Sequence, residues 1–290
     1  MALTQQFVAF ARIRRAGVDW SGVVKYVVVA IAVSWAAWGL MHRLGVPLSI
    51  ANALAMMGPA IGVLAVTGRA GVRSHFDEIV ASLSFARMLE VIGAAYVLVP
   101  ALLGAGAVIA VSTLHQNWTA GASMPTVVEA LTVGMVLALV GASAEEVGWR
   151  GYMFDSLRPV GAGKAAVLIG LVWGAWHIPA ITLYGYNYHD PSLWGVAAMT
   201  AFTVPFSVIL CWARMRGASI LPAIVIHGSF NAMVGIVAVG VTAIDPLLVA
   251  PLGLAGILPM GAFAGWLLVT GRLSAPQLSA GRTALQVESA

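Results

Sequence analysis

Long apolar runs separated by short polar stretches make up most of the chain. Several of these runs reach the ~20 residues that an α-helix needs to cross a hydrocarbon core of ~30 Å. We expect helices at residues 24–41, 50–67, 89–111, 126–150 or beyond, 164–181, 193–213, 219–239 and 246–270. The pattern predicts an all-α, polytopic membrane protein, a bundle of about eight transmembrane helices that forms a single membrane domain over residues 1–290.

Three polar stretches flank these runs. Residues 68–88 carry apolar positions at helical spacing, which predicts a short helix on the membrane surface. Residues 1–23 contain no short apolar region followed by a cleavage site, so we expect a cytosolic lead and not a cleaved signal. Residues 271–290 are small and polar, which predicts a flexible cytosolic tail.

Composition agrees with this class of protein. The 290 residues are 60% hydrophobic and only 9% charged, far from the balance of a soluble domain. Cys211 is the only cysteine, so an intrachain disulfide is impossible. Two pairs of small residues, Gly58 with Gly62 and Gly170 with Gly174, predict places where neighbouring helices approach closely.

The basic residues predict the orientation. With eight helices, the loops on one side contain Arg43 and no other Lys or Arg, whereas the other side holds thirteen: Arg12, Arg14, Arg15, Lys25, Arg69, Arg73, Arg87, Arg158, Lys164, Arg214, Arg216, Arg272 and Arg282. The positive-inside rule puts both termini in the cytosol. We expect the protein in a bacterial or archaeal-type cell membrane. The positive charge therefore indicates contact with membrane lipid and not with nucleic acid. Tyrosines in the external loop 182–192 predict an interfacial aromatic belt.

Charged residues interrupt the apolar pattern near the end of the fourth run. Glu145, Glu146 and Arg150 follow a segment with one charge in seventeen residues. A charge at mid-bilayer costs about 2.5–3.5 kcal/mol, so such groups usually face a protein interior and serve a function. Glu146 and Arg150 are spaced to pair on one helix face, and Glu145 points elsewhere. The alternative is a solvated ion pair at a helix end.

Two later helices carry polar groups at the same spacing. Trp173 and His177 share one face of the fifth helix, and His227 and Asn231 share one face of the seventh. Each pair taken alone also fits a packing role or an interhelical hydrogen bond. Measured along the helix, His177 lies roughly 20 Å from Lys164 and His227 roughly 16 Å from Arg216. Glu145 reaches the same depth if its helix continues past Arg150, so the groups can meet.

These three motifs together resemble the CAAX protease and bacteriocin-processing (CPBP) family, also called the Abi family, to which the eukaryotic CAAX prenyl endopeptidase belongs. The motifs are Glu-Glu-x-x-x-Arg at 145–150, aromatic-x-x-x-His at 173–177 and His-x-x-x-Asn at 227–231, on successive helices. The aromatic position is usually Phe and is Trp173 here. The match covers about residues 126–239, which the resemblance makes the catalytic core.

The resemblance implies an intramembrane endopeptidase that hydrolyses a peptide bond in a hydrophobic or prenylated (CAAX-like) peptide. Glu145 and His177 would activate water, His227 and Asn231 would stabilise the oxyanion, and Glu146 and Arg150 would hold the site together. The family has been described both as metalloproteases and as metal-free glutamate peptidases. Glu145, His177 and His227 would also suit a zinc ion. We favour the metal-free site, because the amide of Asn231 is a poor zinc ligand and a suitable oxyanion donor.

Two other classes of function stay open. Glu145, His177 and His227 could relay protons in a coupled transporter, although the sequence shows no internal repeat of the kind many transporters have. A non-catalytic immunity or scaffold protein could also retain these residues. Cleavage of a hydrophobic peptide, lost on Glu145→Ala, separates the endopeptidase from both.

Overall fold

The computed structural model describes residues 17–82, 84–114, 123–188, 191–240, 245–249 and 251–273. Within these ranges the chain is helical and contains no β-strand. The helices are α2 (Trp20–Arg43), α3 (Leu48–Ala55), α4 (Gly58–Ser82), α5 (Phe85–Ser112), α6 (Met124–Glu129), α7 (Met135–Glu146), α8 (Phe154–Leu157), α9 (Ala162–Trp176), α10 (Ile178–Tyr184), α11 (Leu193–Gly217), α12 (Leu221–Gly240), α13 (Pro246–Val249) and α14 (Leu254–Val269).

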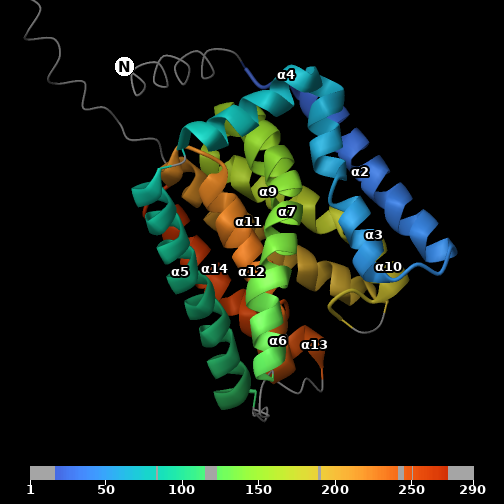
Figure 1. The fold of residues 1–290 in the computed structure, drawn as a ribbon, viewed down its shortest axis with the longest axis vertical. Coiled ribbons are helices and arrows are strands. Elements are labelled where there is room, and N and C mark those ends of the chain that lie inside the picture. Colours follow the sequence, from blue (N-terminus) through green and yellow to red (C-terminus); the bar gives the residue numbers. More distant parts are fainter. Residues whose placement is uncertain are drawn as a thin grey trace, which may run out of the picture.

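The predicted all-α membrane bundle is confirmed. Six helical stretches of the described chain are long and apolar enough to span a membrane, and they are Trp20–Arg43, Leu48–Val80, Met88–Ser112, Met124–Val160, Ala162–Tyr184 and Leu193–Gly217. Two shorter apolar helices, Leu221–Val234 and Leu254–Val269, occupy the places of the last two predicted spans. Figure 1 shows the bundle, with α5 and α2 at opposite edges and α4 running across one end.

The first helix begins four residues before the predicted start. Asp19 caps it, because its carboxylate accepts a hydrogen bond from the Gly22 backbone N–H at 3.0 Å. The predicted surface helix at 68–88 is continuous with the second span. The two parts meet in α4 at Gly68, whose φ of 67° is a conformation that glycine adopts readily. The expectations for residues 1–16 and 274–290 lie outside the described residues.

The fourth run is one long helix that continues past Arg150, as the depth argument required. Two π-helical segments, Ala130–Gly134 and Val147–Met153, interrupt the α-helical pattern. Segments of this kind widen one turn of a helix and often occur at functional sites. The second one begins directly after Glu146 and contains Arg150, so the irregular turn lies beside the charged residues.

The fifth run is broken where one unbroken helix was expected. Helix α9 ends at Trp176 and α10 starts at Ile178, with His177 between them. Pro179 explains the break, because proline has no N–H to bond the carbonyl four residues earlier. His177 therefore lies at a helix junction, where its side chain projects from an irregular turn.

Close helix contacts hold the site-bearing helices together. A side chain at Gly170 would collide with the backbone at Val204, and one at Gly174 would collide with Thr200, both on α11. This proximity lets Thr203 donate a hydrogen bond to the Gly170 carbonyl over 2.9 Å. Gly62 is covered by the Tyr26 ring of α2 in the same way. Both predicted small-residue faces are thus helix interfaces.

Two tyrosines of residues 182–192 make hydrogen bonds within the protein, and the expected interfacial belt stays a prediction. Tyr188 is 5% exposed and its hydroxyl donates to the Leu252 carbonyl over 3.1 Å. Burial raises the pKa of Tyr188 above its usual value, so the hydroxyl stays protonated and can donate. Tyr184 donates to the Trp38 carbonyl over 3.3 Å. Both hydroxyls thus bond to backbone carbonyls of distant segments.

Candidate active site

Two adjacent carboxylates lie at the end of α7, where the π-helical segment begins. Glu145 is 3% exposed and Glu146 is 0% exposed. Because neighbouring helix positions point about 100° apart, the two acids have different partners. Oε2 of Glu145 accepts the indole N–H of Trp173 at 2.9 Å and of Trp149 at 3.4 Å. Glu146 instead binds charged and titratable groups.

Glu146 forms a fully buried ion pair with Arg150. Nη1 of Arg150 donates to Oε1 of Glu146 over 2.7 Å, and both side chains have no exposed surface. Nδ1 of His227 lies 2.9 Å from the same oxygen. The pairing predicted from the spacing is present, and the alternative of a solvated pair at a helix end is wrong. Oε2 of Glu146 and Nε and Nη2 of Arg150 have no hydrogen-bond partner among the described residues.

Trp173 lies at the centre of this group. Its indole N–H holds Glu145, and the guanidinium of Arg150 lies 4.5 Å from the centre of its ring. The ring of His227 stands edge-on to it at 5.1 Å, and the ring of His177 lies 6.1 Å away. One aromatic side chain therefore contacts groups from α7 and the π-helical segment after it, from the α9–α10 junction and from α12. These contacts bring the three sequence motifs together.

The hydrogen bonds fix which ring nitrogens of the two histidines carry protons. Nδ1 of His177 lies 2.8 Å from the backbone carbonyl of Trp173, which can only accept. Nδ1 is therefore the donor, and Nε2 of a neutral His177 is an acceptor. The same reasoning puts a proton on Nδ1 of His227, which faces the Glu146 carboxylate. Both rings thus keep Nε2 for another partner.

Asn231 is the one predicted catalytic residue that is not buried with this group. It follows His227 by one turn on α12, yet its side chain is exposed, whereas His227 is buried. The role of Asn231 stays a prediction.

The middle of the chain matches known proteins. Residues 127–233 match the family model described as type II CAAX prenyl endopeptidase Rce1-like. Over 102 residues the chain is 35% identical to CAAX prenyl protease 2 of Methanococcus maripaludis. The resemblance to the CAAX protease family is confirmed for this part of the chain. The alignment covers 33% of this chain and 38% of that relative, so less than half of either protein is compared.

The matched segment contains all seven residues that the sequence motifs singled out. They are Glu145, Glu146, Arg150, Trp173, His177, His227 and Asn231. Six of them form the buried group described above, and regions outside residues 127–233 supply part of its surroundings. Tyr26 of α2, for example, places its ring edge-on to Trp149, 5.8 Å between centres.

A zinc ion, which the family descriptions allow, would need three neighbouring protein ligands. Among the described residues, no three His, Cys, Asp or Glu side chains form a group that could hold a metal. The hydrogen bonds occupy Oε2 of Glu145 and Nδ1 of both histidines, so Oε1 of Glu145 and the two Nε2 atoms are the ones that could face a metal. In this arrangement Glu145, His177 and His227 do not come together as such a group.

Three aromatic residues around His177 and Glu145 were not identified from the sequence. Trp149 donates to Glu145, Trp176 lies edge-on to His177 at 4.7 Å, and Tyr186 stacks on His177 at 6.1 Å with 13° between the ring planes. Trp149 stands four residues after Glu145, the same spacing that revealed Arg150. That spacing could have identified Trp149, whereas Tyr186 depends on how the loop folds back.

Proposed function

We propose that this protein is an intramembrane endopeptidase that cleaves a hydrophobic or prenylated peptide with water activated by Glu145 and His177. The observation that carries the proposal is the buried carboxylate of Glu145, held by two indole donors beside two histidines whose Nε2 atoms are available. The name of the methanococcal relative, CAAX prenyl protease 2, supports the substrate class.

The first step needs a base beside the scissile bond. Both indole donors bind Oε2 of Glu145, which leaves Oε1 to take a proton from water. Nε2 of neutral His177 can accept the second hydrogen of that water and so orient it. The water oxygen then bonds to the carbonyl carbon, and the carbonyl oxygen becomes an oxyanion.

The second step needs donors for the oxyanion and a proton for the amine. His227 can donate from Nε2 only as an imidazolium, since Nδ1 already faces Glu146. Asn231 adds a neutral amide donor in this proposal. When the C–N bond breaks, Glu145 returns its proton to the leaving amine, so the charge and the atoms balance. No step passes through a metal.

Cleavage of a farnesylated fluorogenic peptide by the purified full-length chain tests this function. We expect Glu145→Gln to lower kcat by about 10²–10⁴-fold while the variant still binds peptide and melts normally, because the amide cannot act as a base. Glu129→Gln is the matched control, since Glu129 is an exposed carboxylate on the same long helix. Mass spectrometry of the products identifies the scissile bond.

Two results contradict the proposal. Unchanged cleavage by Glu145→Gln would remove the general base, and absence of cleavage in wild-type protein with all hydrophobic peptides tested would favour a scaffold or transporter. A chelator arm tests the metal-free step separately. If exhaustive chelation abolishes cleavage and zinc restores it stoichiometrically, Glu145, His177 and His227 are ligands and the assignment of Glu145 as base is wrong.

A further inference from the structure

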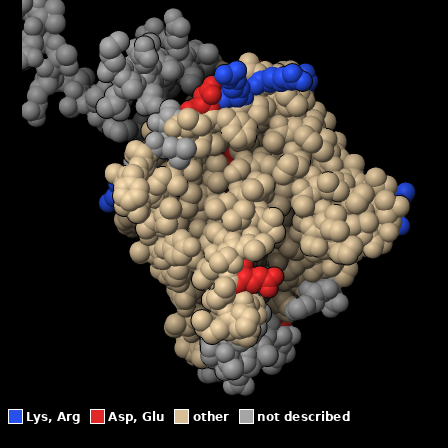
Figure 2. Space-filling model, in the orientation of Figure 1, with Lys and Arg blue, Asp and Glu red and all other residues tan. Residues whose placement is uncertain are grey.

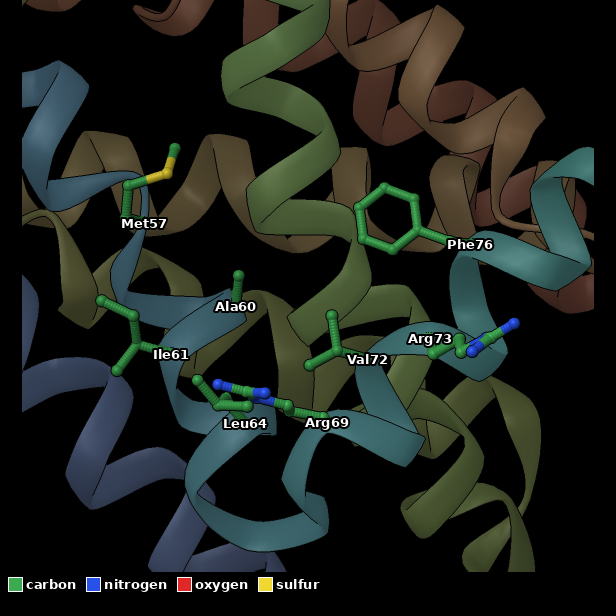
Figure 3. Close-up of a pocket in the computed structure, with 8 residues that line it drawn as sticks. All are labelled: Met57, Ala60, Ile61, Leu64, Arg69, Val72, Arg73 and Phe76. Carbon is green, nitrogen blue, oxygen red and sulfur yellow. The ribbon is translucent and has the colours of Figure 1, made fainter.

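An apolar groove lies in the angle between the two arms of α4, which meet at Gly68, and none of the candidate active-site residues lines it. Its volume is about 400 Å³, and its lining comes only from residues 57–76. Figure 3 shows the apolar side chains Ile61, Leu64, Val72 and Phe76 around the groove, with Arg69 and Arg73 on the same bent segment. In Figure 3 the Arg69 side chain lies along the groove beside Leu64, whereas the Arg73 side chain extends away from it. The groove thus combines a hydrocarbon surface with one positive charge and has a second at its edge.

The two faces of α4 have different neighbours. Gly58, Pro59, Gly62 and Val63 are buried, and Pro59 packs on Gly148 in the π-helical segment that contains Arg150. The opposite face, with Ile61 and Leu64, is exposed. A molecule in the groove would therefore contact α4 from outside the bundle, on the side where a span of this kind meets lipid.

The dimensions fit one leaflet of a bilayer. From Met57 to Thr67 the segment rises about 15 Å at 1.5 Å per residue, which is half of a ~30 Å hydrocarbon core. Arg69 and Arg73 follow immediately, at the depth where headgroups begin. Figure 2 shows Lys and Arg side chains at the end of the molecule that α4 crosses, while most of the rest of this face is uncharged.

Both arginines can bind an anion. Arg69 is exposed and has no ion pair among the described residues. Arg73 faces Asp77 at 3.8 Å, with side chains 82% and 70% exposed, and such a long exposed pair contributes little. Guanidinium groups bind phosphate oxygens strongly. A zwitterionic headgroup would bring its own cation next to them.

We infer that this groove binds one anionic phospholipid from the surrounding leaflet, with an acyl chain along Ile61, Leu64 and Phe76 and the phosphate at Arg69 and Arg73. The binding does not depend on peptidase activity. Because α4 packs directly on the segment that holds Arg150, the bound lipid would also support the helix beside the candidate active site.

Retention of lipid by the purified full-length chain tests this inference. The protein in mild detergent is mixed with equimolar phosphatidylglycerol and phosphatidylcholine of identical acyl chains, and bound lipids are counted by native mass spectrometry. Wild-type protein should retain phosphatidylglycerol preferentially. Removing both charges by Arg69→Gln with Arg73→Gln should lower that preference by about fivefold for each arginine.

Two further variants separate the charge from the groove. Lys164→Gln with Arg216→Gln removes two exposed charges predicted on the same side and should retain the preference. Ala60→Phe fills the groove, keeps both arginines, and should lower retention. Equal retention of the two lipids by wild type, an unchanged ratio in the Arg69/Arg73 variant, or an equal loss in the Lys164/Arg216 control would overturn the inference. The inference would also be overturned if the Arg69/Arg73 variant lost binding of a farnesylated peptide but kept its retention of phosphatidylglycerol.

Discussion

The bundle contains two charged clusters that differ in depth and in the completeness of their hydrogen bonding. The deep cluster joins Glu146, Arg150 and His227, and the Glu146–Arg150 pair at its centre has no exposed surface. The helix-end cluster joins Arg214 of α11 to Glu78 of α4 over 2.6 Å and to Asp155 of α8 over 2.7 Å. Its two carboxylates are 26% and 34% exposed, so water reaches them.

Hydrogen bonding separates the clusters further. Arg214 uses a different nitrogen for each carboxylate, and Glu78 also accepts the backbone N–H of Ile220, just before α12. The helix-end cluster therefore ties three helices and the start of a fourth at their ends. The deep cluster leaves three buried atoms of Glu146 and Arg150 without a hydrogen-bond partner among the described residues. The helix-end cluster leaves one, Oδ1 of Asp155, which lies 4.0 Å from Nη1 of Arg158.

The first prediction breaks the deep cluster. Arg150→Leu should lower the free energy of unfolding by about 3–5 kcal/mol and abolish cleavage, because it leaves the Glu146 charge buried beside His227 alone. Thermal melting and denaturant unfolding in detergent measure the stability. Normal melting of this variant would mean that the pair is solvated in the working protein, and the contrast with the helix-end cluster would disappear.

The second prediction tests whether the candidate active site beside the deep cluster includes Asn231. Asn231→Ala should lower kcat by about 10²–10³-fold with little change in melting, because its side chain is exposed and its predicted role is to donate to an oxyanion. Steady-state cleavage assays separate kcat from KM. A variant with wild-type kcat would limit the site to Glu145, His177 and His227.

The third and smallest prediction breaks the helix-end cluster. Arg214→Gln should lower the free energy of unfolding by about 1.5–3 kcal/mol, the range for hydrogen bonds to charged groups. The effect is smaller than in the deep cluster because the carboxylates of Glu78 and Asp155 are partly exposed and can bond to water. Peptide cleavage at a temperature well below melting should stay within a few fold of wild type. A loss of activity as large as that of Arg150→Leu, without unfolding, would show that the helix-end cluster takes part in catalysis.

The sequence by itself determined the features that depend on neighbouring residues. Apolar runs of about twenty residues required membrane helices, since backbone polar groups in lipid must bond internally. The i,i+4 spacing determined the pairing of Glu146 with Arg150, because both side chains lie on one helix. The motifs at 145–150, 173–177 and 227–231 were sufficient to indicate the CAAX protease family and to predict which helices meet.

Only the tertiary structure decided the contacts between helices, because these depend on how each helix is rotated and where it bends. The indole of Trp173 bonds Glu145, and His227 bonds Glu146, across gaps of 28 and 81 residues. Pro179 could have indicated the break after Trp176, but the stacking of Tyr186 on His177 depends on how the loop folds inward. Arg214 was counted among the basic loop residues, yet it is a buried clamp, since its carboxylate partners come from distant segments that no local spacing relates.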